Sequence, residues 1–432
     1  MGTPIENNTN KINSFNQKLD NFFSSQGAAA PEKPLGSTML IQNAYHIQQP
    51  IDFNNIIVCF LDDFLGYSEN GTDWIIANDT DLGYGEKYIA VSADNSMILA
   101  GSYSCSTLFI SIDGKTWRST LSLPSGVYPT QIYFINGDFY VLRTDGYYSY
   151  SPDGYGWKHY DLITFSGYTT DPLSLMQYNP ILRKYLFISS NNMYVVTNPT
   201  NEYMIEVTWV DWDVIYSEYV YNITCFKGVW IASCSWSLMW SSDGVTWNRY
   251  ENVDYWEDMG NASFYQTDDV LFINDYNMTA KSYYTLDGLT LYTPNAETGH
   301  DGRFYLTSIR PDDKVIFYDG NNFFGWGYHD YYHLDEYISH HGLFISSDLI
   351  NWALVEDDYS FDMSYMYYNY DNGMFLQFNN DTYYIYFSND GERWVQSNLA
   401  RNDIWDSCFL YRFNQIIISF ADATYISYQP DN

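Results

Sequence analysis

The chain is poor in basic residues. Its 432 residues include 19 Lys and Arg against 53 Asp and Glu, which gives a formal net charge of −34. A surface with this excess of negative charge repels nucleic-acid phosphates and anionic lipid headgroups. We therefore expect no nucleic-acid partner. Much of the acid is Asp beside Gly or Asn, which tight turns prefer, so part of the charge reflects a large number of turns.

The chain also lacks long hydrophobic runs, an export signal and paired cysteines. No apolar stretch is long enough to cross a bilayer, and residues 1–17 contain no basic region followed by an apolar core. Five cysteines are scattered at positions 59, 105, 225, 234 and 408 without a Cys-x-x-Cys pair. A two-residue turn at 227–228 would place Cys225 opposite Trp230, not Cys234. We expect no membrane insertion, and reduced thiols in a protein made in a cytoplasm.

Helical periodicity is scarce, whereas aromatic residues are abundant. The chain contains 45 Tyr, 26 Phe and 14 Trp. Aromatic and β-branched side chains fit the half-buried surface of a pleated sheet. The composition therefore predicts an all-β protein.

One amphipathic helix is expected within residues 1–27, before a flexible linker at 28–37. Its apolar stripe consists of Ile12, Phe15, Leu19, Phe22 and Phe23. Thr9 or Asn10 can cap the helix, and Gly27 can end it. The linker is rich in Ala, Pro and Gly. Because a lone helix must bury its stripe, it either packs back on the main body (or frays) or anchors the chain to another subunit, copies of itself included.

From residue 38 to residue 432 the chain is a repeat array. Its unit is clearest in "PTQIYFINGDFYVLRTDGYYSYSPDGYGWKHY" (129–160), where Asn-Gly and Asp-Gly separate four apolar or aromatic runs. Such dipeptides between alternating segments are strong hairpin signals, so each unit predicts a four-stranded antiparallel meander.

The spacing of the repeats favours a β-propeller. Units close near positions 74, 117, 157, 209, 247, 291, 352 and 394, a period near forty residues. We expect eight blades, within a range of seven to nine. About three further strands follow residue 394, and the segment "STMLIQNAYHI" near the N-terminus is expected to complete that last blade. A β-helix or an open array is the structural alternative.

A short motif closes most units, as in "SIDGKTW" (111–117), "SPDGYGW" (151–157), "SSDGVTW" (241–247) and "SNDGERW" (388–394). It resembles the Asp-box, or BNR repeat, of sialidase-like β-propellers, shortened here by one residue to a bare Asp-Gly turn. The resemblance implies a turn between the two outer strands of a blade, away from a site on the ring axis. We expect its residues to be structural: Ser111, Asp113, Gly114, Trp117, Ser151, Asp153, Gly154, Trp157, Ser241, Asp243, Gly244, Trp247, Asp348, Trp352, Ser388, Asp390, Gly391 and Trp394.

Catalytic signatures are missing. The resemblance to sialidases implies three arginines that clamp a carboxylate, the first in an early Arg-Ile-Pro motif, but no Arg precedes Arg118. No Gly-x-Ser-x-Gly, phosphate loop or dinucleotide fingerprint is present. Other glycosidases need only two suitably spaced carboxylates, and 53 acids do not single out a pair. We therefore expect no catalytic residues and no cofactor, with a glycosidase as the alternative.

Four of the seven His lie in "GWGYHDYYHLDEYISHHG" (325–342), inside the longest repeat. We expect an extended hairpin or loop there. Metal binding is the alternative that we set aside, because the spacing matches no ligand pattern and strand alternation separates the side chains. Tyr and His are common where surfaces recognise partners. The expected partner or glycan contacts are Trp326, Tyr328, His329, Tyr331, Tyr332, His333, His340 and His341.

A virion location reconciles an outward-facing propeller with the absence of an export signal. Virion proteins are made in a host cytoplasm and released by lysis. The Asn-, Tyr- and Ile-rich, Arg-poor vocabulary, together with the repeats, resembles bacteriophage tail- or fibre-associated propellers. The expected function is a non-enzymatic structural protein or adhesin, docked to tail or collar proteins by the helix at 1–27. The alternatives are a surface-glycan hydrolase or depolymerase and a bacterial scaffold that holds a protein partner.

Overall fold

The structure is a computed structural model of the chain. It describes residues 39–40, 47–71, 73–162, 172–189, 192–201, 205–211, 219–235, 237–251, 253, 262–275, 281–296, 303–306, 316–318, 322–333, 336–357, 363–369, 374–379, 384–388, 395–400, 408–412, 415–419 and 424–428. The expected helix at 1–27 and the linker at 28–37 lie outside these residues. None of the described residues forms a helical element, and the described part contains no helix able to cross a membrane.

The described strands form nine sheets, numbered 1 to 9 in chain order. Sheet 1 contains β2 (Ile47–Phe53), β3 (Ile56–Leu61), β4 (Phe64–Ser68) and β5 (Ile75–Asp81). Sheet 2 contains β6 (Lys87–Val91), β7 (Ile98–Ser102), β8 (Cys105–Ser111) and β9 (Arg118–Ser122). Sheet 3 contains β10 (Pro129–Ile135), β11 (Asp138–Arg143), β12 (Tyr147–Ser151) and β13 (Lys158–Asp161).

Sheets 4 to 6 continue the series. Sheet 4 contains β14 (Leu173–Asn179), β15 (Lys184–Ser189), β16 (Asn192–Thr197) and β17 (Glu206–Asp211). Sheet 5 contains β18 (Val220–Phe226), β19 (Val229–Cys234), β20 (Ser237–Ser241) and β21 (Asn248–Arg249). Sheet 6 has three strands, β22 (Ala262–Gln266), β23 (Leu271–Asp275) and β24 (Tyr283–Thr285).

Sheet 7 is the largest, with β26 (Arg303–Leu306), β28 (Phe323–His333), β29 (Glu336–Ser346) and β30 (Asn351–Asp357). Two short strands join it: β25 (Asn295–Ala296) pairs parallel with β30, and β27 (Phe317–Tyr318) pairs with β28. Sheet 8 contains β31 (Met363–Asn369), β32 (Met374–Asn379), β33 (Tyr384–Ser388) and β34 (Val395–Ala400). Sheet 9 contains β35 (Cys408–Arg412), β36 (Gln415–Ser419), β37 (Thr424–Tyr428) and β1 (Met39–Leu40).

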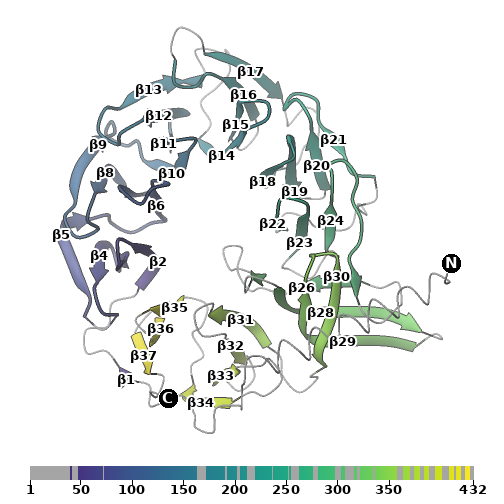
Figure 1. The fold of residues 1–432 in the computed structure, drawn as a ribbon. Helices are drawn as coiled ribbons and strands as arrows, with labels where there is room; N and C mark the ends of the chain where they lie inside the picture. The colour runs from purple at the N-terminus through teal and green to yellow at the C-terminus, as the bar shows by residue number, and fades with distance from the viewer. Residues whose placement is uncertain are drawn as a thin grey trace.

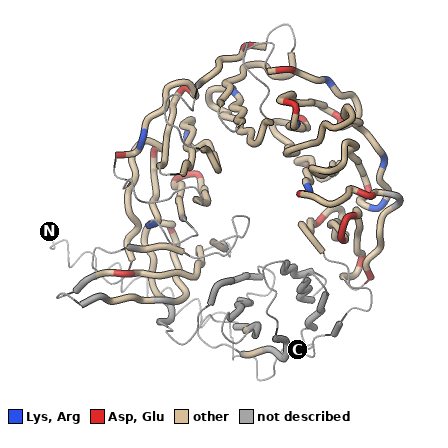
Figure 2. Tube along the Cα trace, turned by 180° about the vertical axis from the view of Figure 1, so that it is seen from behind, with Lys and Arg blue, Asp and Glu red and all other residues tan. Residues whose placement is uncertain are grey.

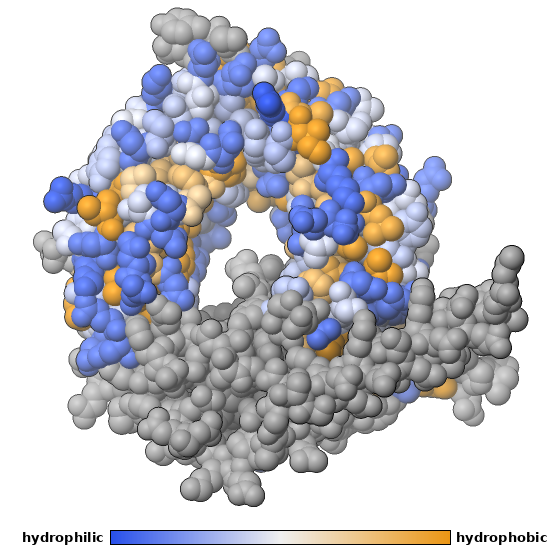
Figure 3. Space-filling model, viewed as in Figure 1, coloured by the Kyte–Doolittle hydropathy of each residue, from blue (hydrophilic) through white to orange (hydrophobic). Residues whose placement is uncertain are grey.

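The sheets follow one another around a ring, and strands such as β2, β6, β10, β14, β18, β22 and β35 lie nearest the centre of the ring within their sheets (Figure 1). The ring closes as the sequence predicted, because β1 pairs antiparallel with β37 and thereby adds an N-terminal strand to the C-terminal sheet. Figure 3 shows a hollow at the centre of the ring. The all-β, propeller-like architecture is therefore confirmed.

The expected count of eight is one below the nine sheets that the described residues form. Eight closing positions mark sheets 1 to 8, and sheet 9 carries no such position. It is assembled from both ends of the chain, so a count of sequence repeats misses it.

The hydrophobic core lies between sheets. Each of six buried clusters joins side chains of two sheets adjacent in the chain, from the pair 1 and 2 to the pair 6 and 7. Phe53 and Ile98, for example, are both fully buried in the cluster between sheets 1 and 2. A single sheet cannot bury both of its faces, so each depends on its neighbours.

Each meander has two edges with different contents. The turns between first and second strands and between third and fourth strands lie at one end of the strands. They form one face of the ring, which we call the turn edge. The turns between second and third strands and the links to the next sheet lie at the opposite end of the strands, on the opposite face of the ring. We call this face the connection edge. Hairpins of the turn edge use the predicted dipeptides: Asn136 and Gly137 both have positive φ, as do Lys227 and Gly228. Cys225 pairs with Trp230 as expected, and Cys59, Cys105, Cys225 and Cys234 are free thiols.

Candidate functional site

The repeated Ser-x-Asp-Gly motif forms a closed hydrogen-bonded turn. In residues 241–247 the Asp243 carboxylate accepts hydrogen bonds from the N–H groups of Val245 and Thr246, both 2.7 Å long, and from the Ser241 hydroxyl at 3.1 Å. The N–H of Gly244 donates to the same hydroxyl oxygen at 2.8 Å, and Trp247 Nε1 donates to the Gly244 carbonyl at 2.9 Å. The polar groups of the motif are thus used within the turn.

The same geometry recurs in the other described copies. The carboxylate of the motif accepts two N–H groups at Asp113, Asp153, Asp287 and Asp348. Hydrogen bonds from the N–H groups of Gly156 and Tyr155 and from the Ser151 hydroxyl lower the pKa of Asp153 below its ordinary value. The indole N–H of Trp117, Trp157 and Trp352 donates to the carbonyl of the residue three positions earlier.

One copy of the motif lies largely outside the described residues, and one unit lacks the motif in its sequence. Ser388 lies in β33, but its side chain and all of Asp390, Gly391 and Trp394 lie outside the described residues. Trp209 has no such turn before it, and its Nε1 donates to Asn192 instead, at 2.9 Å.

The turns also press on the preceding sheet. A Cβ on Gly244 would lie 2.8 Å from Val195 of sheet 4, and one on Gly114 would lie 2.7 Å from Val58 of sheet 1. Trp117 belongs to the core between sheets 1 and 2, and Trp247 to the core between sheets 4 and 5. The motif residues thus lie where one sheet packs against the next, and their role there is structural.

The His-rich segment is a hairpin, as expected, formed by β28 and β29 with His333 paired to Glu336 at its end. Three of the expected contact residues, Trp326, His329 and Tyr331, are only 3%, 2% and 8% exposed, so they offer little surface to a partner. β28 lies between two strands of sheet 7 there, because β26 pairs with it along 327–330 and β29 pairs with its other side. Tyr328 and His340 are partly buried, whereas the side chains of Tyr332, His333 and His341 lie outside the described residues.

Neighbouring side chains of the hairpin bond to one another. His329 pairs with His340 across the strands, and Tyr331 Oη lies 3.2 Å from His340 Nε2. Asp330 accepts hydrogen bonds from Ser339 at 2.5 Å and from Tyr305 at 3.3 Å. Among the described residues no group of three or more His, Cys, Asp or Glu is placed to hold a metal ion.

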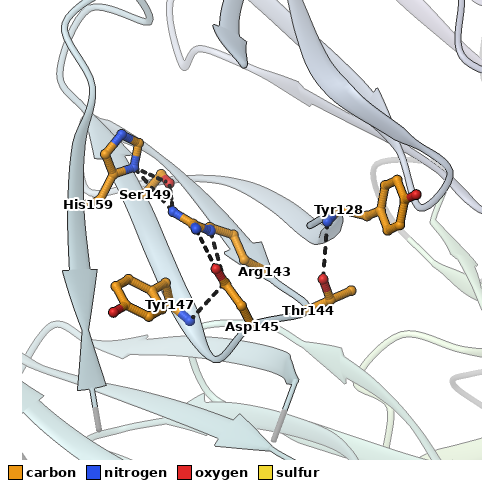
Figure 4. A network of polar contacts seen from close by, with 7 residues as sticks. All are labelled: Tyr128, Arg143, Thr144, Asp145, Tyr147, Ser149 and His159. Atoms are coloured by element: carbon orange, nitrogen blue, oxygen red, sulfur yellow. Dashed lines mark hydrogen bonds and ion pairs between the residues drawn. The ribbon is translucent and has the colours of Figure 1, made fainter. Parts of the chain in front are cut away.

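A polar network in sheet 3 was missed by the sequence analysis (Figure 4). The Arg143 guanidinium, nearly buried, makes two bonds to Asp145: Nε to Oδ1 at 3.0 Å and Nη2 to Oδ2 at 2.5 Å. Its Nη1 lies 3.4 Å from His159 Nδ1, and the Ser149 hydroxyl lies 2.8 Å from the same nitrogen. A serine beside a histidine is the geometry of an activated nucleophile. Ser149 is fully buried, however, so the network ties β11, β12 and β13 together.

Polar side chains of the inner strands hold consecutive sheets together. Gln49 of β2 donates to the carbonyl of Lys87, the first residue of β6, at 2.9 Å. Asn222 of β18 donates in the same way to Ala262, the first residue of β22, at 3.3 Å. Asn274 exchanges two hydrogen bonds with the backbone of Leu306. These groups near the ring axis are therefore engaged in the fold.

The connection edge exposes tyrosines. Tyr84 is 87% exposed and Tyr103 48% exposed in sheet 2, and Tyr219 and Tyr221 are 57% and 53% exposed at the start of sheet 5. Tyr103 also contacts Tyr128, which leads into sheet 3, with ring centroids 6.3 Å apart. Large exposed rings are favoured where a surface recognises a partner. With 45 tyrosines in the chain, sequence could not single these out; the two glycines that flank Tyr84 were the usable signal.

Acidic positions are spread around the ring and outnumber basic ones (Figure 2). At the connection edge Asp63 pairs with the buried Lys87 at 3.2 Å, and Glu86 accepts a hydrogen bond from Tyr88 at 2.9 Å. The candidate site is thus an aromatic surface with carboxylates at its border.

No protein-family model and no curated protein matches the chain. Solved structures with a similar fold include the WD40 domain of SCAP from fission yeast, 11% identical over 91% of this chain and 95% of that one, with a TM-score of 0.45. Others are the Dos1 propeller (11% identity, 79% and 93% covered, TM-score 0.43) and YCF48 bound to D1 peptide (11%, 75% and 98%, 0.39). These likenesses concern architecture alone, and the propeller-like fold of this chain rests on its own sheets.

Proposed function

We propose that the chain is a non-enzymatic binding propeller that recognises its partner through the connection edge. The exposed tyrosines of that edge carry the proposal. Tyrosine offers a large, rigid contact surface at a low cost in conformational entropy. The turn edge, by contrast, uses its polar groups within its own turns.

The arrangement of titratable groups supports binding over catalysis. A hydrolytic serine must reach its substrate, but Ser149 is fully buried behind its histidine. The motif carboxylates of Asp113, Asp153, Asp243 and Asp287 accept two backbone N–H groups each, and their pKa values lie below the ordinary value. A general acid would need the opposite, a raised pKa.

The finer proposal is a bacteriophage virion protein of the tail, fibre or collar. The N-terminal segment 1–27, with its predicted apolar stripe and linker, would dock the chain to other virion proteins or to copies of itself. The ring would then face outward and bind a host-surface glycan or protein. Its strong negative charge favours recognition by aromatic and polar contacts over recognition by basic patches.

The test is the location of the protein in purified virions. The full chain and a variant lacking residues 1–27 are produced during infection and followed by mass spectrometry. We expect the full chain in virions and the variant in the soluble fraction. A full chain that stays soluble and unassociated contradicts the virion proposal. Incubation with host capsule or cell-wall polysaccharide is the second assay: shortened polysaccharide chains would contradict the non-enzymatic proposal and favour a depolymerase.

A further inference from the structure

At the boundary between sheets 2 and 3, Tyr103 contacts Tyr128 and lies opposite Glu86 at the connection edge, and Tyr84 lies in the link just before Glu86. Tyr103 N donates to the Glu86 carbonyl at 2.8 Å, which extends the β6–β7 ladder by one pair beyond Lys87 and Ser102. Glu86 therefore lies opposite Tyr103. It shares its face with Tyr88, which belongs to the core between sheets 2 and 3. We call Tyr84, Tyr103, Tyr128 and Glu86 the tyrosine platform.

The backbone under the platform is held in place. Gly83 and Gly85, on either side of Tyr84, have positive φ, and a Cβ on either would lie 3.1 Å from the Ser104 hydroxyl. Ser102 and Ser104 both donate to the Leu82 carbonyl. Tyr128 is fixed in turn by two hydrogen bonds to Thr144, one through each backbone group. A platform that is ordered before binding loses less entropy when it binds.

The ring geometry favours a flat ligand. The Tyr103 and Tyr128 centroids are 6.3 Å apart, and their planes are tilted by 33°. A group inserted between two rings needs a contact distance of roughly 3.5–4 Å on each side, which is more than this gap provides. A ligand must therefore lie across the two tyrosine rings, with the tyrosine hydroxyl groups at its periphery.

The charges oppose an anionic ligand, and the ring arrangement opposes a cationic one. Glu86 is exposed, and the net charge of −34 opposes a carboxylated or phosphorylated ligand. Its Oε2 already accepts the Tyr88 hydroxyl at 2.9 Å, so a ligand meets a carboxylate that is partly satisfied. The remaining lone pairs of the Glu86 carboxylate can accept hydrogen bonds from hydroxyl groups of a ligand. A cation would prefer rings arranged as a cage around it, which this tilted pair does not form.

We propose that the tyrosine platform binds an uncharged pyranose unit of a glycan. Its C–H face lies across Tyr103 and Tyr128, Tyr84 covers its edge, and its hydroxyls donate to Glu86. The inference rests on the proposed function, because it names the class of ligand for the same edge of the ring.

The test is a set of calorimetric titrations of the full chain. The neutral probes are maltotetraose, mannotetraose, galactotetraose and chitotetraose. The charged probes are tetragalacturonate, choline and a tetralysine peptide. We expect at least one neutral tetrasaccharide to saturate the protein, and the anion not to bind. Saturation by choline or tetralysine without any neutral sugar overturns the proposal, and so does a lack of binding by all four neutral sugars.

Variants then place the site. Tyr103→Ala should weaken sugar binding about tenfold, the loss expected when an aromatic contact is removed. Tyr103→Phe should keep most of the affinity because it keeps the ring. Tyr155→Ala is the matched control, since Tyr155 is 54% exposed, close to the 48% of Tyr103, but lies in the motif turn of sheet 3 at the turn edge, outside the proposed binding surface. Equal losses of affinity in Tyr103→Ala and Tyr155→Ala, or no loss in either, would contradict this position for the site.

The two proposals fail separately. If the chain is present in virions and Tyr103→Ala reduces their adsorption to host cells, but no neutral sugar binds, the ligand class is wrong and the proposed function stands. If a neutral sugar binds through Tyr103 but the chain is absent from virions, the virion assignment is wrong and the platform stands.

Discussion

The hydroxyl of Ser149 lies 2.8 Å from Nδ1 of His159, across the β12–β13 pair of sheet 3. Nη1 of Arg143 lies 3.4 Å from the same nitrogen. Since a guanidinium can only donate, Nδ1 must accept, and the proton of the neutral ring belongs on Nε2. Burial lowers the pKa of His159 below its ordinary value of 6.5, and Arg143 lowers it further, against the opposing effect of Asp145.

This contact predicts a loss of stability in acid. Because the folded-state pKa of His159 is lower than the unfolded one, its contribution is fully present above pH 6.5 and is lost as the pH falls through the folded-state pKa. His159→Gln cannot take up the proton and should lose less stability over that range. Urea unfolding at several pH values above and below 6.5 measures the free energy of unfolding of both proteins. Parallel curves for both proteins would contradict the prediction.

Gly244 should be sensitive because it meets the neighbouring sheet. Its φ is 83°, and an added Cβ would lie 2.8 Å from Val195 and 2.9 Å from Trp230. Gly126 has nearly the same φ, 81°, but nothing lies within 4 Å of an added Cβ. Gly126→Ala should therefore lower the free energy of unfolding by about 1–2 kcal/mol, the cost of a left-handed backbone at a residue with a Cβ. Gly244→Ala should lose roughly 1–3 kcal/mol more. Urea unfolding of the two variants compares them, and equal losses would show that the sheet-to-sheet contact is unimportant.

Leu349 occupies the place that glycine takes in the other turns. It has a φ of 62° and is fully buried in the core between sheets 6 and 7. Leu349→Ala should lose about 2–5 kcal/mol through the cavity it leaves. In most positions Gly is about 0.5–1 kcal/mol worse than Ala. At Leu349 we expect the order to reverse, because Gly relieves the left-handed backbone. Thermal unfolding of both variants decides the order.

Ring closure by β1 should be needed for stability. A chain lacking residues 1–37 keeps Met39 and Leu40, which pair with Ile426 and Tyr425 of β37. A chain lacking residues 1–41 leaves that edge of β37 unpaired, and open edges promote association between chains. We expect the shorter deletion to leave the melting temperature unchanged, and the longer one to lower it and to increase aggregation in light scattering. Identical behaviour of the two chains would contradict a closing role for β1.

The turns and hairpins could be predicted from sequence because their chemistry is local. Asn136-Gly137 and the Ser241–Gly244 turn place donors and acceptors within a few residues, and a positive φ follows from glycine. Closure by the N-terminal strand followed from counting strands, since the C-terminal sheet was one short. The N-terminal helix stays a prediction.

Exposure, by contrast, was decided only by tertiary structure. The aromatic residues of 325–342 resemble a contact loop in sequence, yet Trp326 and His329 are buried in sheet 7, where β26 pairs beside β28 along 327–330. Tyr103 and Tyr128 belong to different sheets and meet because the sheets pack side by side. Arg143, Ser149 and His159 lie on three strands of one sheet. The strand register brings the Arg143 guanidinium and the Ser149 hydroxyl to the same nitrogen, Nδ1 of His159. A strand's own residues decide how it turns, but the neighbouring sheet decides which of its side chains reach the solvent, because each core is shared by two sheets.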